Sequence, residues 1–145
     1  MVIYLFDFDN TIVKLPYKES INYMDTDESL SPSLDFNLIQ STLSDYKQAV
    51  NNNDGPIFLL SNRVVGVKKA LKSILKTFGY VFEDFFLIDG EDRSKGNRLN
   101  KILSNYPNCT TVRYWEDKDK HITSIKEELK KHPNIQLEVV KTDLF

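Results

Sequence analysis

The stretch Val2-Ile3-Tyr4-Leu5-Phe6-Asp7-Phe8-Asp9-Asn10-Thr11 joins a short apolar run to two acidic residues separated by one position. A continuous apolar run is typical of a parallel strand that is covered on both faces. In an extended chain Asp7 and Asp9 point to the same side, so two carboxylates converge just beyond the strand. Two like charges about 4 Å apart repel by roughly 4 kcal/mol at an effective dielectric constant of 20. The fragment indicates a site where a cation or a shared proton compensates the acids; the alternative is a solvated turn with two ordinary acids.

Further apolar runs alternate with helix-like segments along the rest of the chain. The expected strands are Val2–Phe6, Ile57–Leu60, Phe85–Ile88, Thr111–Trp115 and Ile135–Val140. The expected helices are Ser33–Val50, Val64–Phe78, Lys95–Tyr106 and Asp119–His132. Such alternation is typical of a parallel sheet with helices on both faces, in which ligands bind beyond the carboxyl ends of the strands. The prediction is an α/β fold, a three-layer Rossmann-like sheet, forming a single domain over residues 1–145.

Polar residues follow two further expected strands. Ser61 and Asn62 come directly after the second strand, where a hydroxyl and the backbone N–H groups of a following helix suit a phosphate oxygen. Either residue also fits a simple N-cap of that helix. Glu116 and Asp117 follow the fourth strand. The alternative for these two acids is that the dipole of the next helix favours them there.

A metal site follows if the sheet brings these strand ends together, because Asp7, Asp9 and Asp117 would then form a cage of carboxylate oxygens. Hard oxygen ligands without histidine or cysteine favour Mg²⁺ over Zn²⁺. Lys95 begins the helix before the fourth strand. The helix dipole disfavours a cation there, which suggests an anionic partner. The alternative is that Lys95 is an ordinary solvated lysine.

The composition excludes several other classes of protein. The chain has 145 residues, of which 19 are basic, 21 acidic and 41% hydrophobic, so it is neither mostly disordered nor a globally basic nucleic-acid coat. One cysteine and two histidines argue against a disulfide framework and a zinc site. The first residues lack a signal-peptide pattern, and no apolar run reaches the roughly 18 residues of a membrane span. The expectation is a soluble, intracellular, cytoplasmic protein with no membrane partner.

The order of the motifs resembles that of the haloacid dehalogenase (HAD) superfamily of phosphohydrolases. Asp-x-Asp-x-Thr after the first strand, Ser61 after the second, then Lys95 and paired acids after a later strand match that order over residues 1–121. The resemblance implies a HAD-like sheet and a Mg²⁺-dependent phosphatase that transfers a phosphoryl group in two steps. Asp7 would attack phosphorus and form an aspartyl-phosphate. Asp9 would protonate the leaving oxygen and then activate water.

The same resemblance assigns the remaining roles. The Asp7 carboxylate, the backbone carbonyl of Asp9 and Asp117 would hold Mg²⁺. A phosphate among several carboxylates requires the neutralisation that the metal and a lysine supply. The residues that would bind the phosphoryl oxygens are Ser61, Asn62 and Lys95, and the supporting residues would be Thr11, Arg63, Glu116 and His121.

Within the superfamily, the sequence is most similar to the branch described as Swiss-army-knife RNA-repair-like, and more distantly to the polynucleotide 3′-phosphatases. The matching stretches are Phe6-Asp7-Phe8-Asp9-Asn10-Thr11, Leu60-Ser61-Asn62-Arg63, Lys95 with Leu99 and Leu103, and Glu116-Asp117-Lys118 with His121-Ile122. Asn10, Glu116 and Lys118 depart from the usual pattern, in which Gly, Asp and Arg are common. The similarity implies a terminal phosphate on nucleic acid, a 3′ phosphate, as the substrate in nucleic-acid repair.

Two features bear on the size of the substrate. The gaps between the motifs leave no room for a sizeable cap domain, and an open site favours a large substrate. Val13–Pro32 would instead close over small substrates as a lid, with Tyr17, Tyr23 and Met24 as its apolar contacts.

A second half richer in basic residues also favours nucleic acid. Through Ser61 the chain has three basic and nine acidic residues, whereas the remainder has 16 basic and 12 acidic. The basic residues near the expected site are Arg63, Lys68, Lys72, Lys76, Arg93, Lys95, Arg98 and Lys101. They predict either a positive track for nucleic acid or a solvated helix face. His121 would contact substrate, orient Asp117 or serve only the structure, while Phe8 and Trp115 are expected in the core.

Three functions remain open on the sequence alone. The first is the nucleic-acid phosphatase, and the second is a nucleotide or phosphoprotein phosphatase with the same machinery. The third is a non-catalytic binding module that kept the HAD fold.

Overall fold

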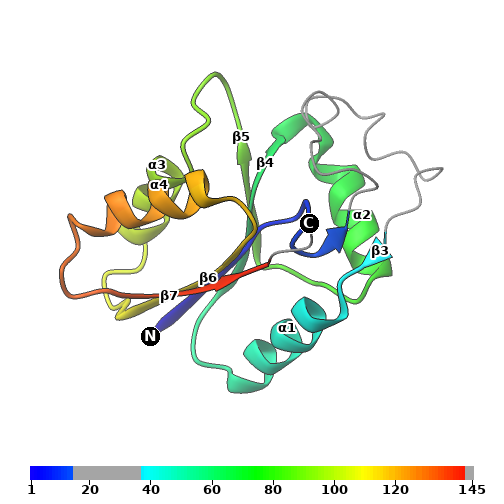
Figure 1. Ribbon diagram of the computed structural model, residues 1–145, viewed down its shortest axis with the longest axis horizontal. Helices are drawn as coiled ribbons and strands as arrows, with labels where there is room; N and C mark the ends of the chain where they lie inside the picture. Colours follow the sequence, from blue (N-terminus) through cyan, green and yellow to red (C-terminus); the bar gives the residue numbers. More distant parts are fainter. Residues whose placement is uncertain (15–36, 143–145) are drawn as a thin grey trace.

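A five-stranded parallel sheet forms the centre of the computed structural model, which describes residues 1–14 and 37–142 (Figure 1). Its strands are β1 (Val2–Phe6), β4 (Ile57–Val64), β5 (Asp84–Ile88), β6 (Thr111–Glu116) and β7 (Gln136–Lys141). Their order is β5-β4-β1-β6-β7, and every neighbouring pair is parallel. This confirms the predicted α/β, Rossmann-like class.

Helices cover both faces of the sheet (Figure 1). They are α1 (Gln40–Asn52) and α2 (Lys68–Thr77) on one face, and α3 (Lys95–Ser104) and α4 (Asp119–Leu129) on the other. Successive residues of a strand point to opposite faces. Tyr4 and Phe6 therefore pack toward α1 and α2, while Ile3 and Leu5 pack toward α3 and α4.

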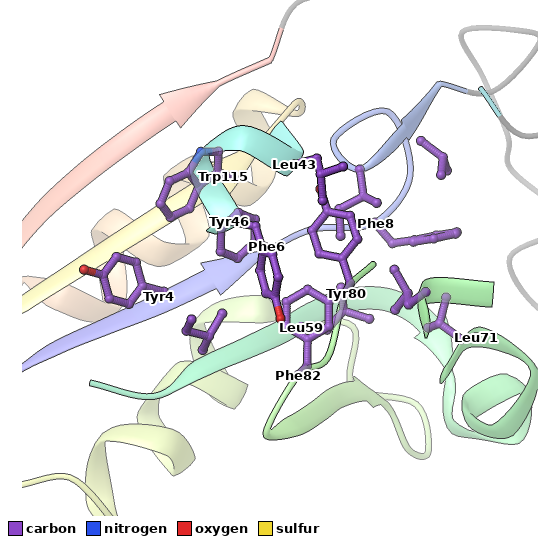
Figure 2. Close-up of a cluster of buried hydrophobic side chains, with 14 of the residues drawn as sticks. Tyr4, Phe6, Phe8, Leu43, Tyr46, Leu59, Leu71, Tyr80, Phe82 and Trp115 are labelled. Atoms are coloured by element: carbon purple, nitrogen blue, oxygen red, sulfur yellow. The ribbon is translucent and has the colours of Figure 1, made fainter. Parts of the chain in front are cut away.

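The core beneath α1 and α2 is rich in aromatic rings (Figure 2). Trp115 stacks on Phe6 with 4.1 Å between ring centroids. Phe8 and Trp115 are both buried, which confirms that they belong to the core. Since Phe8 stands between Asp7 and Asp9 in the chain, this core anchors the turn that carries the two acids.

The second strand is longer than predicted. The pattern placed its end at Leu60 and began a helix at Val64, but β4 continues to Val64, and the α-helix begins only at Lys68 after a 3-10 turn over Val65–Val67. A register shift between Leu60 and Val64 lets the chain pair with β5 again at Ile88. Ser61 and Asn62 are consequently strand residues, and the prediction that they lie at a helix N-terminus is wrong.

The first helix also starts later than predicted. Asn37–Leu38 form a short strand, β3, that pairs antiparallel with β2 (Val13–Lys14), and the helix begins at Gln40. Ile39 between them donates its N–H to the carbonyl of Ile12. This pairing fixes 37 and 38 in an extended conformation, so the helical spacing of apolar residues there was misleading. The start of the prediction, 33–36, lies outside the described residues.

No cap domain separates the later motifs. Between Ser61 and Lys95 the chain forms only the rest of β4, the 3-10 turn, α2 and β5. The lid predicted over Val13–Pro32, with Tyr17, Tyr23 and Met24, falls mostly outside the described residues. Among the helices that the structure describes, none has the length and apolarity required to span a bilayer.

Candidate active site

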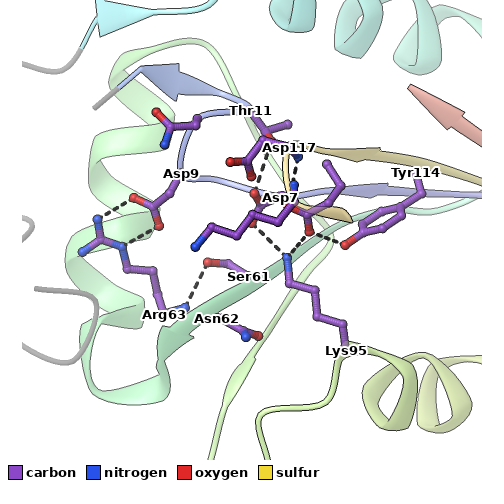
Figure 3. Close-up of polar contacts among 12 residues, drawn as sticks. Asp7, Asp9, Thr11, Ser61, Asn62, Arg63, Lys95, Tyr114 and Asp117 are labelled. Carbon is purple, nitrogen blue, oxygen red and sulfur yellow. Dashed lines mark hydrogen bonds and ion pairs between the residues drawn. The ribbon is translucent and has the colours of Figure 1, made fainter. Parts of the chain in front are cut away.

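The carboxyl ends of β4, β1 and β6 lie side by side because these strands are neighbours in the sheet. A pocket of about 360 Å³ opens there. The predicted site residues that line it are Asp7, Asp9, Asn62, Lys95, Asp117 and His121. The other predicted residues, Thr11, Ser61, Arg63 and Glu116, lie behind its wall and are buried. Most of these side chains are seen together in Figure 3.

Lys95 joins acids from two different strands (Figure 3). Its ammonium group lies 3.0 Å from Asp7 Oδ1 and 2.6 Å from Glu116 Oε1, and its side chain is fully buried. Burial alone would lower the pKa of Lys95, but the charges of Asp7 and Glu116 outweigh it and hold the pKa above its ordinary value. Lys95 is therefore a permanent cation at the pocket floor rather than a solvated lysine.

Glu116 holds this arrangement together. Its Oε1 accepts hydrogen bonds from Lys95 and from the Tyr114 hydroxyl, and its Oε2 accepts from the N–H groups of Asp117 and Lys118. Burial acts to raise the pKa of Glu116, but the charge of Lys95 and side-chain hydrogen bonding with its neighbours outweigh burial and lower the pKa to about 2. A carboxylate engaged on both oxygens has little capacity left for a ligand. The contacts of Glu116 are thus with neighbouring protein groups on both oxygens, an arrangement compatible with the supporting role predicted for it.

Oxygens of Asp7, Glu116 and Asp117 all lie within 4.8 Å of one another. Burial, and then the charge of Glu116, raises the pKa of Asp7 to about 6. Burial, and then the charge of Asp7, raises the pKa of Asp117 to about 10. One lysine cannot neutralise this group of acids, so a proton or a further cation must compensate it. A set of carboxylate oxygens under this repulsion fits Mg²⁺.

Asp9 belongs to a separate ion pair. Arg63 donates from Nε to Asp9 Oδ2 at 3.0 Å and lies 2.6 Å from Oδ1 through its terminal nitrogen, with both side chains buried (Figure 3). The expected cage of Asp7, Asp9 and Asp117 side chains is therefore corrected: Glu116 stands in the cluster, and the Asp9 carboxylate faces Arg63. Burial still raises the pKa of Asp9 above its ordinary value, although Arg63 opposes this.

The end of β4 is fixed by an arginine from α3. Arg98 donates to the backbone carbonyls of Ser61 at 2.6 Å and Phe86 at 3.0 Å, and also to the side-chain oxygen of Asn62. The Ser61 hydroxyl accepts the N–H of Arg63 at 3.1 Å and is buried, so Asn62 is the β4 residue that forms the pocket wall.

The predicted basic track is only partly present. Arg63, Lys95 and Arg98 are all buried in the contacts described above, so none of them is a surface cation. Lys68 lies 3.9 Å from the exposed Asp84. Of the predicted basic residues that stay at the surface, Arg93 lines the pocket, and it is joined there by Lys118 and Lys120, which the predicted track did not include.

His121 also faces the pocket, from the first turn of α4. Burial, and then the charge of Lys95, lowers the pKa of His121 to about 3, so its imidazole is neutral at neutral pH. A neutral imidazole in the wall can accept or donate one hydrogen bond to a bound molecule.

Sequence reasoning missed one residue in contact with the site loop. The Thr11 hydroxyl donates to Asp7 Oδ2 at 3.2 Å, as its supporting role predicts. Thr142, just past β7, lies 3.3 Å from that hydroxyl and donates its own to the carbonyl of Asn10 at 2.9 Å. A lone threonine after the last strand carries no pattern that would have identified it.

No protein-family model and no curated protein matches the sequence. Among solved structures, the fold is similar to a chain of a Pnkp1/Rnl/Hen1 complex, with a TM-score of 0.68, 15% identity and 99% of this chain covered. A chain of the Pnkp1/Rnl/Hen1 RNA repair complex matches with a TM-score of 0.67 at the same identity and coverage. The present chain spans only 46% and 43% of those two chains. At this identity the likeness shows a shared fold.

Proposed function

We propose that this chain is a HAD-type, Mg²⁺-dependent phosphomonoesterase that works through an aspartyl-phosphate. The observation that carries the proposal is the position of Asp7: it lines the pocket, and Lys95 and Thr11 hold its two oxygens. A carboxylate fixed in this way is oriented for attack on phosphorus. Asp7 and Asp117 would hold the metal, which when bound offsets the negative charge that a phosphate brings to these acids.

The proposed reaction has two steps, and this chain's own residues supply both. An Asp7 oxygen forms a bond to phosphorus while the ester P–O bond breaks, and Asp9 gives its proton to the leaving oxygen. Asp9 then takes a proton from water, which attacks phosphorus, releases inorganic phosphate and restores Asp7. Burial raises the pKa of Asp9 and so favours the protonated form that this exchange needs. Because Arg63 occupies both oxygens of Asp9, it must release one of them before that oxygen can carry the proton. Lys95 stays charged and faces the phosphoryl oxygens.

The proposed substrate is a terminal phosphate on nucleic acid. The rim cations Arg93, Lys118 and Lys120 support it, since phosphodiesters next to the end would meet positive charge. The likeness to chains of an RNA repair complex supports the same class, and so does the lack of a cap between Ser61 and Lys95. A nucleotide or phosphoprotein phosphatase would use the same floor of the pocket.

A panel of phosphate esters tests these proposals. The panel holds an aryl phosphate, nucleotides, phosphopeptides and oligonucleotides with 3′ or 5′ phosphate. Phosphate release should require Mg²⁺, stop with EDTA, and be lost in Asp7→Asn while the exposed-acid control Asp84→Asn keeps it. Catalytic efficiency should be highest for the 3′-phosphorylated oligonucleotide. Activity that survives in Asp7→Asn would remove the aspartyl-phosphate, and no release from any ester would favour a non-catalytic binding module.

A second experiment tests the part of the proposal that concerns the rim cations. In Lys118→Gln/Lys120→Gln, efficiency on the oligonucleotide should fall and depend less on salt, whereas efficiency on the aryl phosphate should change little. An equal loss on both substrates would argue against nucleic acid and leave the phosphatase proposal standing.

A further inference from the structure

The residue just past β7 reaches the loop that follows β1, although β6 lies between these strands. Thr142 donates its N–H to the carbonyl of Glu116 at 3.0 Å, which continues the β6–β7 ladder by one residue. The Thr142 side chain extends past the end of β6, and its hydroxyl donates to the carbonyl of Asn10 at 2.9 Å. One residue thus joins the carboxyl ends of three strands.

The loop that Thr142 contacts has an uncommon backbone. Asn10 has φ of 58°, in the left-handed region, and is 2% exposed. The N–H of Asn10 donates to the carbonyl of Val13, and the N–H of Ile12 donates to the carbonyl of Phe8. This tight turn directs the carbonyl of Asn10 toward β7. A buried carbonyl needs a hydrogen-bond donor, and Thr142 provides one.

The Thr11 hydroxyl has one proton and two nearby acceptors. Asp7 Oδ2 lies at 3.2 Å and Thr142 Oγ1 at 3.3 Å. Thr142 donates its hydroxyl proton to the carbonyl of Asn10. For the Thr11 proton, the Asp7 carboxylate is a stronger acceptor than the Thr142 hydroxyl. Thr11 therefore donates to Asp7 while its oxygen rests against Thr142. The position of the Asp7 carboxylate depends in this way on a residue that does not contact it.

We propose that Thr142 is a positioning residue, which holds the 7–11 loop so that Thr11 orients the Asp7 carboxylate. This inference rests on the proposed function, because it assigns Asp7 the attacking oxygen. It adds to the site a residue that follows β7, the edge strand next to β6. None of the motifs identified along the chain includes this residue. Removing the hydroxyl should loosen the loop without removing any side chain that lines the pocket.

The test compares Thr142→Val, which removes the hydroxyl at nearly constant shape, with Thr142→Ser, which keeps it. Thr110→Val is the matched control, because Thr110 also donates to a backbone carbonyl, that of Met1, but at an exposed position away from the pocket. The substrates are the aryl phosphate and the best ester of the panel, with Mg²⁺. Amide hydrogen exchange of residues 10–13 is measured on all four proteins, independently of activity.

In Thr142→Val we expect kcat to fall about tenfold at unchanged KM, because misplacing a reacting group slows the chemical step more than binding. Thr142→Ser should restore kcat, and amides 10–13 should exchange faster only in Thr142→Val. Wild-type kcat in Thr142→Val, or equal loss in the valine and serine variants, would overturn the inference. If the wild-type protein hydrolyses no ester, the proposed function fails, and unchanged exchange at 10–13 in Thr142→Val would then overturn the positioning role separately.

Discussion

Replacing Lys95 with methionine would remove the cation that joins Asp7 to Glu116. At an effective dielectric constant of 20, the contacts of 3.0 and 2.6 Å each correspond to a gross attraction of about 6 kcal/mol. Burying the ammonium group costs several kcal/mol in return. The change leaves two buried carboxylates without their partner, and breaking a buried pair in this way typically costs about 3–5 kcal/mol. Proton uptake by Asp7 would keep the loss near the lower end of that range.

Urea unfolding at neutral pH, without metal, measures this loss directly. Lys130→Met is the control, because Lys130 is 71% exposed and pairs with the exposed Glu127. Its free energy of unfolding should stay within about 0.5 kcal/mol of the wild-type value. The double variant Lys95→Met/Glu116→Gln should be more stable than Lys95→Met alone, since it removes one of the uncompensated charges. A loss below about 1 kcal/mol in Lys95→Met, or no recovery in the double variant, would refute the electrostatic reasoning.

Other predictions concern positions away from this ion pair. The buried Tyr80 hydroxyl has no hydrogen-bond partner among residues 1–14 and 37–142, whereas that of Tyr46 donates to the carbonyl and accepts from the N–H of Val81. In urea unfolding, Tyr80→Phe should therefore be neutral or stabilising, and Tyr46→Phe should cost about 1–2 kcal/mol. A cost for Tyr80→Phe as large as that for Tyr46→Phe would contradict this. Burial raises the pKa of the Cys109 thiol. As the pH is increased, alkylation of Cys109 by iodoacetamide should therefore accelerate at a higher pH in the native protein than in urea. The same pH dependence in both conditions would contradict the raised pKa. At the left-handed Asn10, Asn10→Gly should be tolerated and Asn10→Ala should lose about 1–2 kcal/mol, and equal stability of the two variants would argue against backbone strain.

The fold was predictable because its strands are continuous apolar runs and its helices have clear apolar stripes. The placement of the acids was predictable for the same reason, since parallel strands deliver residues such as Asp7 and Asp117 to one edge of the sheet. The φ of 58° at Asn10 suits a position at which glycine is common in the HAD pattern that the sequence resembles. Asparagine is among the few other residues that adopt the left-handed conformation readily.

What the sequence did not reveal are partners that lie far apart along the chain. Arg63 and Asp9 are 54 positions apart, and helical spacing suggested an exposed Arg63 because β4 was expected to end too early. Arg98 was placed on a basic surface, although it shares a helical face with the buried Lys95 and Ile102. That shared face is the one signal that could have identified Arg98 as a buried arginine.

The distribution of charge in the pocket also bears on where a metal would bind. Asp9 has Arg63, and both Asp7 and Glu116 have Lys95. Asp117 alone among these acids has no basic partner within the part of the chain that the structure describes, and it is also partly exposed. Burial and the charge of Asp7 therefore raise the pKa of Asp117 to about 10, and a cation bound there would take the place of its proton. Asp7 and Asp117 both line the pocket and have oxygens within 4.8 Å of each other, whereas the Asp9 carboxylate is paired with Arg63, which is why the side chains of Asp7 and Asp117 are the proposed ligands.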